Sequence, residues 1–159
     1  MGKNKINWKT LAVAVLLCQV AGIIGSFFTA PNISTWYASL NKPSFQPPNS
    51  VFAPVWISLY TCMGVSLYVI WNEKKTAKRD NALKWFYAQL ALNAAWSIVF
   101  FGMKEIAAGL LILLLLTAVL AVTMIKFWKI NENAAGPLVP YLLWCCLAAA
   151  LNYSVWILN

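Results

Sequence analysis

Three polar side chains recur at four-residue spacing in an apolar stretch of this sequence: Gln89, Asn93 and Ser97. A helix turns once in about 3.6 residues, so the three side chains would lie on one face of a helix. Amide and hydroxyl groups can hydrogen-bond, but they need a neighbouring acid or base to act in catalysis. Two interpretations stay open: hydrogen bonds between packed helices, which we favour, and direct contact with a ligand.

Groups that usually carry catalysis or bind metals are scarce. The 159 residues include no His and only four Asp or Glu. Paired carboxylates, Ser/His/Asp or Cys/His arrangements and His-ligated metals are therefore not expected, nor is ion-coupled transport through buried carboxylates. The cysteines fall inside apolar stretches, which disfavours disulfides: Cys18, Cys62, Cys145 and Cys146. We expect no metal, no cofactor and no ordinary hydrolytic activity.

Five apolar stretches of roughly 20 residues must position these side chains. They run over 8–28, 51–71, 82–101, 106–128 and 138–158, contain no Asp or Glu, and hold lysines only near their ends. At about 1.5 Å of rise per residue, each can cross the hydrocarbon layer of a membrane as a helix. The chain is 62% hydrophobic, and several of its nine Trp stand near the ends of stretches, as expected at membrane interfaces. The sequence predicts one all-α membrane domain over 1–159, a bundle of five transmembrane helices.

The basic residues predict an orientation. The N-terminal tail, the second connection and the fourth connection hold ten of the twelve Lys and Arg, and the other side holds only Lys42 and Lys104. By the positive-inside rule, the N-terminus is cytoplasmic and the C-terminus is external. This clustering explains the net charge of +8, so we expect no nucleic-acid partner. The first stretch is expected to stay as a span and not to be cleaved as a signal peptide.

The connection between the first two stretches, 29–50, is unlike the others. It is long and apolar, and it contains four prolines: Pro31, Pro43, Pro47 and Pro48. Long connections in compact domains are often lids or binding loops, and proline stiffens a loop because it fixes φ. The prediction is a lid, with a plain connector as the alternative.

Aromatic and small residues share faces of the second and fifth stretches. Trp56, Tyr60 and Gly64 follow one another by one helical turn, as do Trp144, Ala148 and Asn152. A flat, mostly apolar ligand could stack on the two indoles while their N–H groups hold its polar edge. Taken alone, the small residues favour the other interpretation, close packing of helices.

Residues 36–48 read WYASLNKPSFQPP. This segment resembles the WYxxLxKPxWxPP loop of the translocator protein family, also called peripheral benzodiazepine receptors or tryptophan-rich sensory proteins. Similar segments follow in register, namely VFAPVW at 51–56, QLALNAAW at 89–96, PYLLW at 140–144 and LNY at 151–153. The resemblance runs from about Trp36 to Asn159. It implies a bundle of five helices, often dimeric, whose first loop closes over a pocket between the first, second and fifth helices.

The resemblance also implies a function. Members bind porphyrins such as protoporphyrin IX, haem-type tetrapyrroles and hydrophobic drug-like molecules, which suggests a receptor in tetrapyrrole trafficking or stress responses. The residues expected to bind the ligand are Trp56, Tyr60, Asn93, Ser97, Trp144 and Ala148. Those expected in the lid are Trp36, Tyr37, Phe45, Pro47 and Pro48. With the resemblance, we favour the pocket over simple packing.

Alternatives to a receptor remain. Light-dependent porphyrin degradation is one, for which the resemblance implicates Trp56 and Trp144; the passive carriage of hydrophobic ligands is the other. Whether the protein is an enzyme therefore stays open, and we favour that it is not. A homodimer is also expected, with Ala91 and Ala95 of the third stretch as a packing surface.

Two departures from the family pattern limit these expectations. Phe45 stands where the family usually has Trp, so an aromatic contact is kept but a hydrogen-bond donor is lost. No Lys or Arg follows Tyr153, so the cholesterol motif of animal members is incomplete and that mode of recognition is not expected. The missing basic residue favours a bacterial member in the plasma membrane.

Overall fold

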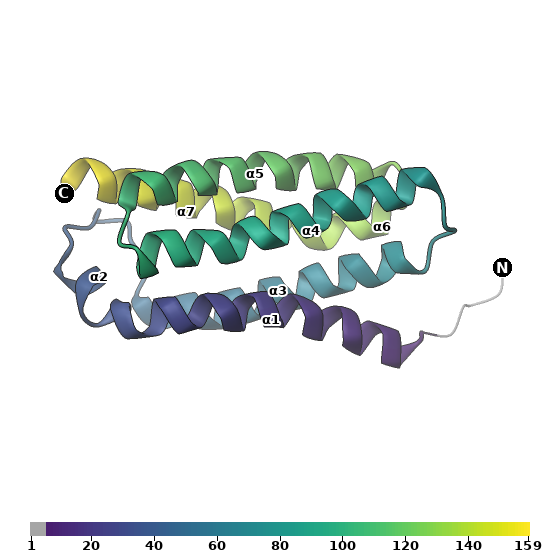
Figure 1. Cartoon of the computed structure of the whole chain (residues 1–159), viewed down its shortest axis with the longest axis horizontal. Coiled ribbons are helices and arrows are strands. Elements are labelled where there is room, and N and C mark those ends of the chain that lie inside the picture. Colours follow the sequence, from purple (N-terminus) through teal and green to yellow (C-terminus); the bar gives the residue numbers. More distant parts are fainter. Residues whose placement is uncertain (1–5) are drawn as a thin grey trace.

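The computed structural model describes residues 6–159, and every regular element in that range is a helix. Long helices run side by side along an elongated bundle (Figure 1). The elements are α1 (Trp8–Ile33), α2 (Trp36–Ser39), α3 (Asn49–Trp71), α4 (Ala77–Ser97), the π-helical turn η1 (Ile98–Gly102), α5 (Ile106–Trp128), α6 (Glu132–Ala135), the 3-10 turn η2 (Gly136–Leu138) and α7 (Val139–Leu158). The prediction of an all-α membrane fold is confirmed.

Four segments are long and apolar enough to cross a membrane: α1, α3, α5 and the stretch Glu132–Leu158 that ends with α7. The third predicted span is not among them. Its helix, α4, begins at Ala77 and not at Ala82, so Lys78, Arg79 and Asp80 enter its first turn and make it more polar. The count of five spans therefore stays a prediction.

The first connection is shorter than 29–50. Helix α1 continues through Pro31 to Ile33, and α3 begins at Asn49. Side chains near the end of α1 hydrogen-bond back to the carbonyl one turn earlier: Thr29 to Gly25 at 3.0 Å and Asn32 to Phe28 at 3.0 Å. Beyond the helix, the Thr35 hydroxyl donates to the Pro31 carbonyl at 3.0 Å, one of the last four carbonyls of α1 and so one without a partner inside the helix. What remains of the connection includes the single turn α2, which lies at the same end of the bundle as the C-terminal residues (Figure 1).

Helices α1 and α3 approach each other very closely. A Cβ added at Gly64 would lie 2.5 Å from the Cα of Val15, and one added at Gly22 would lie 2.3 Å from the Tyr60 ring. Only glycine leaves enough room for such contacts between helices. The small residues thus do pack helices, and Gly22 also makes room for a ring that belongs to the predicted site.

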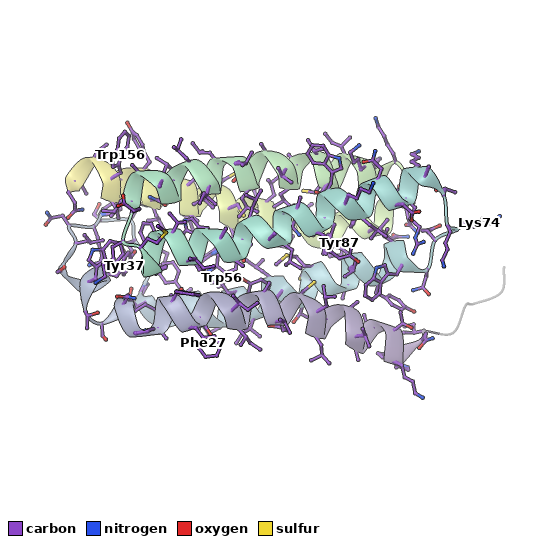
Figure 2. The ribbon with its side chains drawn as sticks, viewed as in Figure 1. Phe27, Tyr37, Trp56, Lys74, Tyr87 and Trp156 are labelled. Atoms are coloured by element: carbon purple, nitrogen blue, oxygen red, sulfur yellow. The ribbon has the colours of Figure 1, made fainter. Side chains whose placement is uncertain are left out.

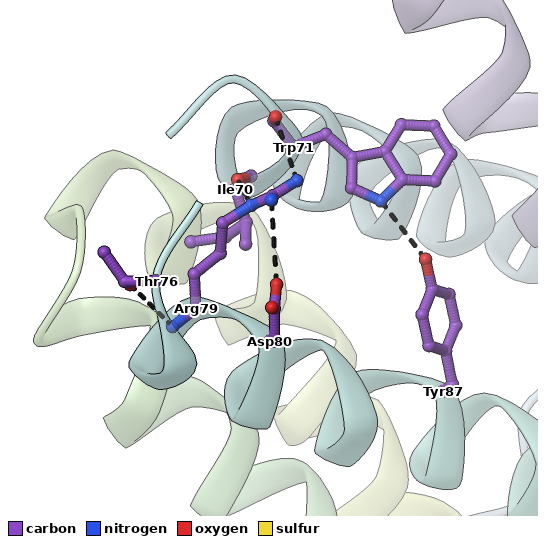
Figure 3. A network of polar contacts seen from close by, with 6 residues as sticks. All are labelled: Ile70, Trp71, Thr76, Arg79, Asp80 and Tyr87. Atoms are coloured by element: carbon purple, nitrogen blue, oxygen red, sulfur yellow. Dashed lines mark hydrogen bonds and ion pairs between the residues drawn. The ribbon is translucent and has the colours of Figure 1, made fainter. Parts of the chain in front are cut away.

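The turn between α3 and α4 is held by a buried arginine (Figure 3). Arg79 donates from Nε to the Ile70 carbonyl at 3.1 Å and from Nη2 to the Trp71 carbonyl at 3.2 Å. Its guanidinium also lies 3.7 Å from the carboxylate of Asp80, which is largely exposed. Carbonyls at the end of α3 therefore bind a side chain of α4, which fixes how the two helices join.

Candidate functional site

Trp56 stands at the centre of a cluster of aromatic rings. Its ring stacks on Tyr60 at a centroid distance of 5.7 Å and lies 6.3 Å from Trp96. Tyr141 and Trp144, both on α7, meet it edge-on at 6.2 and 6.5 Å. These separations are typical of favourable aromatic pairs. Two predicted site residues from distant parts of the sequence, Trp56 and Trp144, are thus in direct contact, and Figure 2 places Trp56 between the helices.

Behind this cluster, Asn93 bridges two helices with its side-chain amide. Its Oδ1 accepts a hydrogen bond from the Tyr60 hydroxyl, and its Nδ2 donates to the Tyr141 hydroxyl at 2.9 Å. Asn93 is 1% exposed, so these bonds replace contacts with solvent. The amide therefore holds the tyrosines in place, which supports the interhelical interpretation for this residue.

The other residues of the polar face of α4 differ from Asn93. Gln89 is fully buried and its Nε2 lies 3.9 Å from the Met63 sulfur, a weak contact, while its Oε1 has no partner within residues 6–159. Ser97 is buried against Gly25 of α1, where an added Cβ would come within 2.9 Å of the serine oxygen. Ala148 is half-buried and packs against the main core. The structure thus places Ser97 and Ala148 in the packed interior, and among residues 6–159 the Ser97 hydroxyl makes no hydrogen bond.

The aromatic cluster continues toward the first connection. Trp96 stacks on Phe100 at 5.5 Å, and Phe100 in turn contacts Trp36 at 5.5 Å and Tyr37 at 6.1 Å. The π-helical turn η1 supplies Phe100 and Phe101, which with Tyr37 form a small buried core of their own. Two of the predicted lid residues, Trp36 and Tyr37, therefore pack on Phe100 of η1, which itself stacks on Trp96 of α4.

Tyr37 anchors the connection by more than its ring. It is buried, its hydroxyl donates to Gln46 Oε1 at 3.1 Å, and the Lys42 ammonium lies 5.1 Å from its ring centre. Burial raises the pKa of the Tyr37 phenol above its ordinary value of 10.0. Figure 2 shows Tyr37 at one end of the bundle and Lys74 at the other.

The remaining predicted lid residues, Phe45, Pro47 and Pro48, are more exposed than Tyr37. Phe45 is 52% exposed, and no aromatic pair within residues 6–159 includes it, so the expected ring contact is not made in this conformation. Pro47 is half-buried, and Pro48 precedes the first residue of α3. The connection is instead tied down at Asn41, which exchanges hydrogen bonds of 2.9 and 3.0 Å with the side chain of Asn159.

Two features of the indoles bear on ligand binding. The N–H of Trp96 donates to Asn152 Oδ1 at 3.2 Å, whereas no hydrogen bond recorded in the described part of the chain uses the N–H of Trp56 or Trp144. Both of these rings are half-buried. They can therefore still reach a polar group on a bound molecule.

Sequence reasoning missed Phe100, Phe101 and Tyr141 as members of the cluster. Two signals were available. Phe101 extends the four-residue spacing of Asn93 and Ser97, and Tyr141 precedes Trp144 by three positions, which places both on one face of α7.

An all-helical chain with four membrane-length apolar segments and an interior of stacked rings is an integral membrane protein of the helical-bundle class. The TspO/MBR family profile matches residues 14–157, nearly the whole chain. The chain therefore belongs to the TspO/MBR family.

Relatives from three domains of life agree with that assignment. The tryptophan-rich protein TspO of Archaeoglobus fulgidus is 38% identical over 155 residues, which cover 97% of this chain and 99% of that protein. The human translocator protein is 40% identical over 135 residues, covering 84% of this chain and 80% of the relative. The tryptophan-rich sensory protein of Cereibacter sphaeroides is 32% identical over 154 residues, covering 97% and 94%. The resemblance drawn from the sequence is confirmed.

Proposed function

We propose that the protein is a membrane receptor for porphyrins and other flat hydrophobic molecules, which bind at the rings around Trp56 and Trp144. The observation that carries this proposal is the contact of these two indoles, from α3 and α7, with both N–H groups unpaired within the described residues. A tetrapyrrole offers a large flat face for stacking and polar groups at its edge. A part in tetrapyrrole trafficking or stress responses would follow from such binding.

Tyr60, Asn93, Ser97 and Ala148 form the wall of the proposed site. The rings touch one another in this conformation, so a porphyrin binds by parting Trp56 from Trp144 and replacing ring–ring contacts with ring–ligand contacts. Asn93 keeps Tyr60 in place during this exchange through their hydrogen bond. Trp36 and Tyr37 cover the end of the cluster, so opening of the connection that carries them gives the ligand access.

A titration of purified protein with protoporphyrin IX, followed by the absorbance of the porphyrin, tests the proposal. Loss of two stacking partners, at about 0.5–1.5 kcal/mol each, predicts roughly 10-fold weaker binding or more in the Trp56→Ala, Trp144→Ala double variant. Trp128→Ala is the matched control, because Trp128 is exposed at the far end of α5. Equal affinity of the double variant and the control would refute the assigned site.

The same samples separate the two alternatives from simple binding. Degradation predicts that porphyrin is consumed under light at a rate that saturates with its concentration and falls in either Trp variant. Carriage predicts that porphyrin enters sealed proteoliposomes faster than it enters empty liposomes. Binding without either change supports a receptor.

We propose further that α4 with η1 is a fifth span, and that the N-terminus is cytoplasmic in a bacterial plasma membrane. Ten basic residues support this orientation. Lys3 and Lys5 lie outside the described residues, and the other eight, from Lys9 to Lys129, lie within them. Ser44 is exposed on the opposite end of the bundle, in the first connection. A cysteine at Ser44 should react with a membrane-impermeant thiol reagent in intact cells, and reaction only after lysis would reverse the orientation.

A homodimer through α4 is also proposed. Ala91 is exposed and Ala95 half-buried on the face of α4 that turns away from the core, and small residues there allow a second helix to approach. Cysteine at Ala91 should then form a disulfide between two copies in membranes. Cysteine at Leu111, exposed on α5, is the control that should not.

A further inference from the structure

The end of the bundle opposite the first connection contains two cavities that the porphyrin site does not use. One, of about 230 Å³, lies between the beginning of α4 and the end of α5 and is lined by Lys78, Asn81, Val122, Ile125, Lys126 and Lys129. The other, of about 360 Å³, is almost wholly apolar and lies between the end of α5 and the beginning of α7. The two cavities share Ile125 and Lys129, so they flank one ridge of α5.

The first cavity is cationic in a specific arrangement. Lys78 reaches across from α4 and donates from Nζ to the carbonyl of Lys129 at 3.0 Å, which holds its ammonium at the cavity. Lys126 extends over the Trp85 ring at 5.5 Å. No acidic side chain lines the cavity within residues 6–159. Three lysines therefore line one small volume.

The nearest acids in the sequence have other contacts or lie elsewhere. Asp80 is beside Arg79 at 3.7 Å, and Glu73 accepts a hydrogen bond from Asn131 at 2.6 Å. Glu132 is exposed in the first turn of α6. The three lysines of the cavity are thus free to attract an anion from outside the protein.

The floor of the same cavity is apolar. Ile125 and Val122 lie about one and two turns before the end of α5, so they are farther from the end of the bundle than Lys129. Ile125 also lines the second cavity, together with Trp128, Gly136 and Val139. A molecule that bound here would meet ammonium groups at one end and hydrocarbon surface at the other, which is the pattern of a phospholipid at a membrane surface.

We propose that this groove between α4 and α5 is a binding site for an anionic phospholipid. The phosphate group lies among Lys78, Lys126 and Lys129, and the first part of an acyl chain lies along Val122 and Ile125. Charge complementarity selects an anionic lipid over a zwitterionic one. The site is separate from the aromatic cluster, so the proposal is independent of porphyrin binding.

Native mass spectrometry of delipidated protein, titrated with phosphatidylglycerol or phosphatidylcholine, tests the site. A lysine near an anionic lipid contributes a factor of about five in affinity, so removal of three predicts a loss on the order of 100-fold. The test variant is Lys78→Gln, Lys126→Gln, Lys129→Gln. The matched control is Lys9→Gln, Lys74→Gln, Lys75→Gln, which removes the same charge from exposed positions outside the cavity. Lys126→Gln alone, which breaks no hydrogen bond among residues 6–159, covers the case in which the triple variant fails to fold; its expected loss of affinity is about fivefold.

The expected result is a preference for phosphatidylglycerol that the test variant loses and the control keeps. Equal losses in the two triple variants would overturn the proposal, because general attraction by surface lysines would then explain the binding. Equal binding of the two lipids by the unchanged protein would also overturn it. Binding of glycerol phosphate as tight as that of phosphatidylglycerol would point to a free-phosphate site and refute the assignment to a lipid.

Discussion

The amide of Asn93 offers the sharpest test of how the aromatic cluster is held. Replacement by Ala removes two hydrogen bonds, one from the Tyr60 hydroxyl and one to the Tyr141 hydroxyl, at a position 1% exposed. Hydrogen bonds between membrane helices average about 0.6 kcal/mol each and reach about 1.7 kcal/mol. Asn93→Ala is therefore expected to lower the free energy of unfolding by about 1–3 kcal/mol.

The measurement is equilibrium unfolding in detergent, combined with a double-mutant cycle. Tyr60→Phe removes the hydroxyl but keeps the ring that stacks on Trp56. Because the Tyr60 hydroxyl and the Asn93 amide share a hydrogen bond, Asn93→Ala should destabilise the Tyr60→Phe protein less than the unchanged protein, by about 0.6–1.7 kcal/mol. Additive effects of the two substitutions would refute the reasoning, as would an Asn93→Ala protein as stable as the original.

Three more predictions concern other contacts. Gly64→Ala should lower the free energy of unfolding by about 1–3 kcal/mol, because its Cβ would overlap the backbone of Val15, whereas Gly136→Ala, with nothing within 4 Å, should be neutral or slightly stabilising in the same assay. Arg79→Ala should lower the free energy of unfolding by about 2–4 kcal/mol, because it removes the two hydrogen bonds to carbonyls of α3, and Asp80→Ala should lower it by less than about 0.5 kcal/mol. Similar losses in the two variants would contradict the role of these carbonyl bonds in the turn of Figure 3. Burial raises the pKa of Tyr37 in the folded state, so the folded state favours the neutral phenol. The contribution of Tyr37 to the free energy of unfolding is therefore complete below about pH 10, the pKa in the unfolded state, and is lost as pH rises through the higher pKa of the folded state. Near-ultraviolet circular dichroism between pH 9 and about pH 12 should therefore show a loss of signal that is reduced in Tyr37→Phe, and identical pH curves would contradict this.

The pattern of apolar stretches was enough to predict the helical class, since membrane length and lack of charge depend only on local sequence. The bounds were harder. The first predicted stretch ended at residue 28, yet α1 continues through Pro31 to Ile33, and the Thr35 hydroxyl just beyond it donates to the Pro31 carbonyl. Helix α4 begins at Ala77 because Thr76 caps it, its hydroxyl accepting a hydrogen bond from the Arg79 N–H at 3.2 Å. The charge of Arg79 is satisfied by the carbonyls of α3, a partner that no local pattern reveals.

The candidate site was predictable in part. Helical spacing correctly placed Trp56 and Tyr60 on one face of α3, and they stack. Which rings from other helices meet them depends on how the helices pack. Tyr141 and Phe100 therefore had no predicted role, although each contacts the cluster directly. The cationic cavity was missed for the same reason, since its lysines come from the start of one helix and the end of another.

In the proposed site Trp56 and Trp144 touch, so a ligand that enters between them must replace this contact. Entry between Trp56 and Trp144 breaks their contact and disturbs that of Trp144 with Phe52, and each aromatic pair contributes about 0.5–1.5 kcal/mol. A ligand must recover more than these few kcal/mol to bind. A ring the size of a single indole recovers only what it displaces, whereas a tetrapyrrole covers both indoles at once and adds further apolar area at about 25 cal/mol per Å². Affinity should therefore rise with the flat area of the ligand, and an indole or benzene derivative that bound as tightly as protoporphyrin IX would contradict this account.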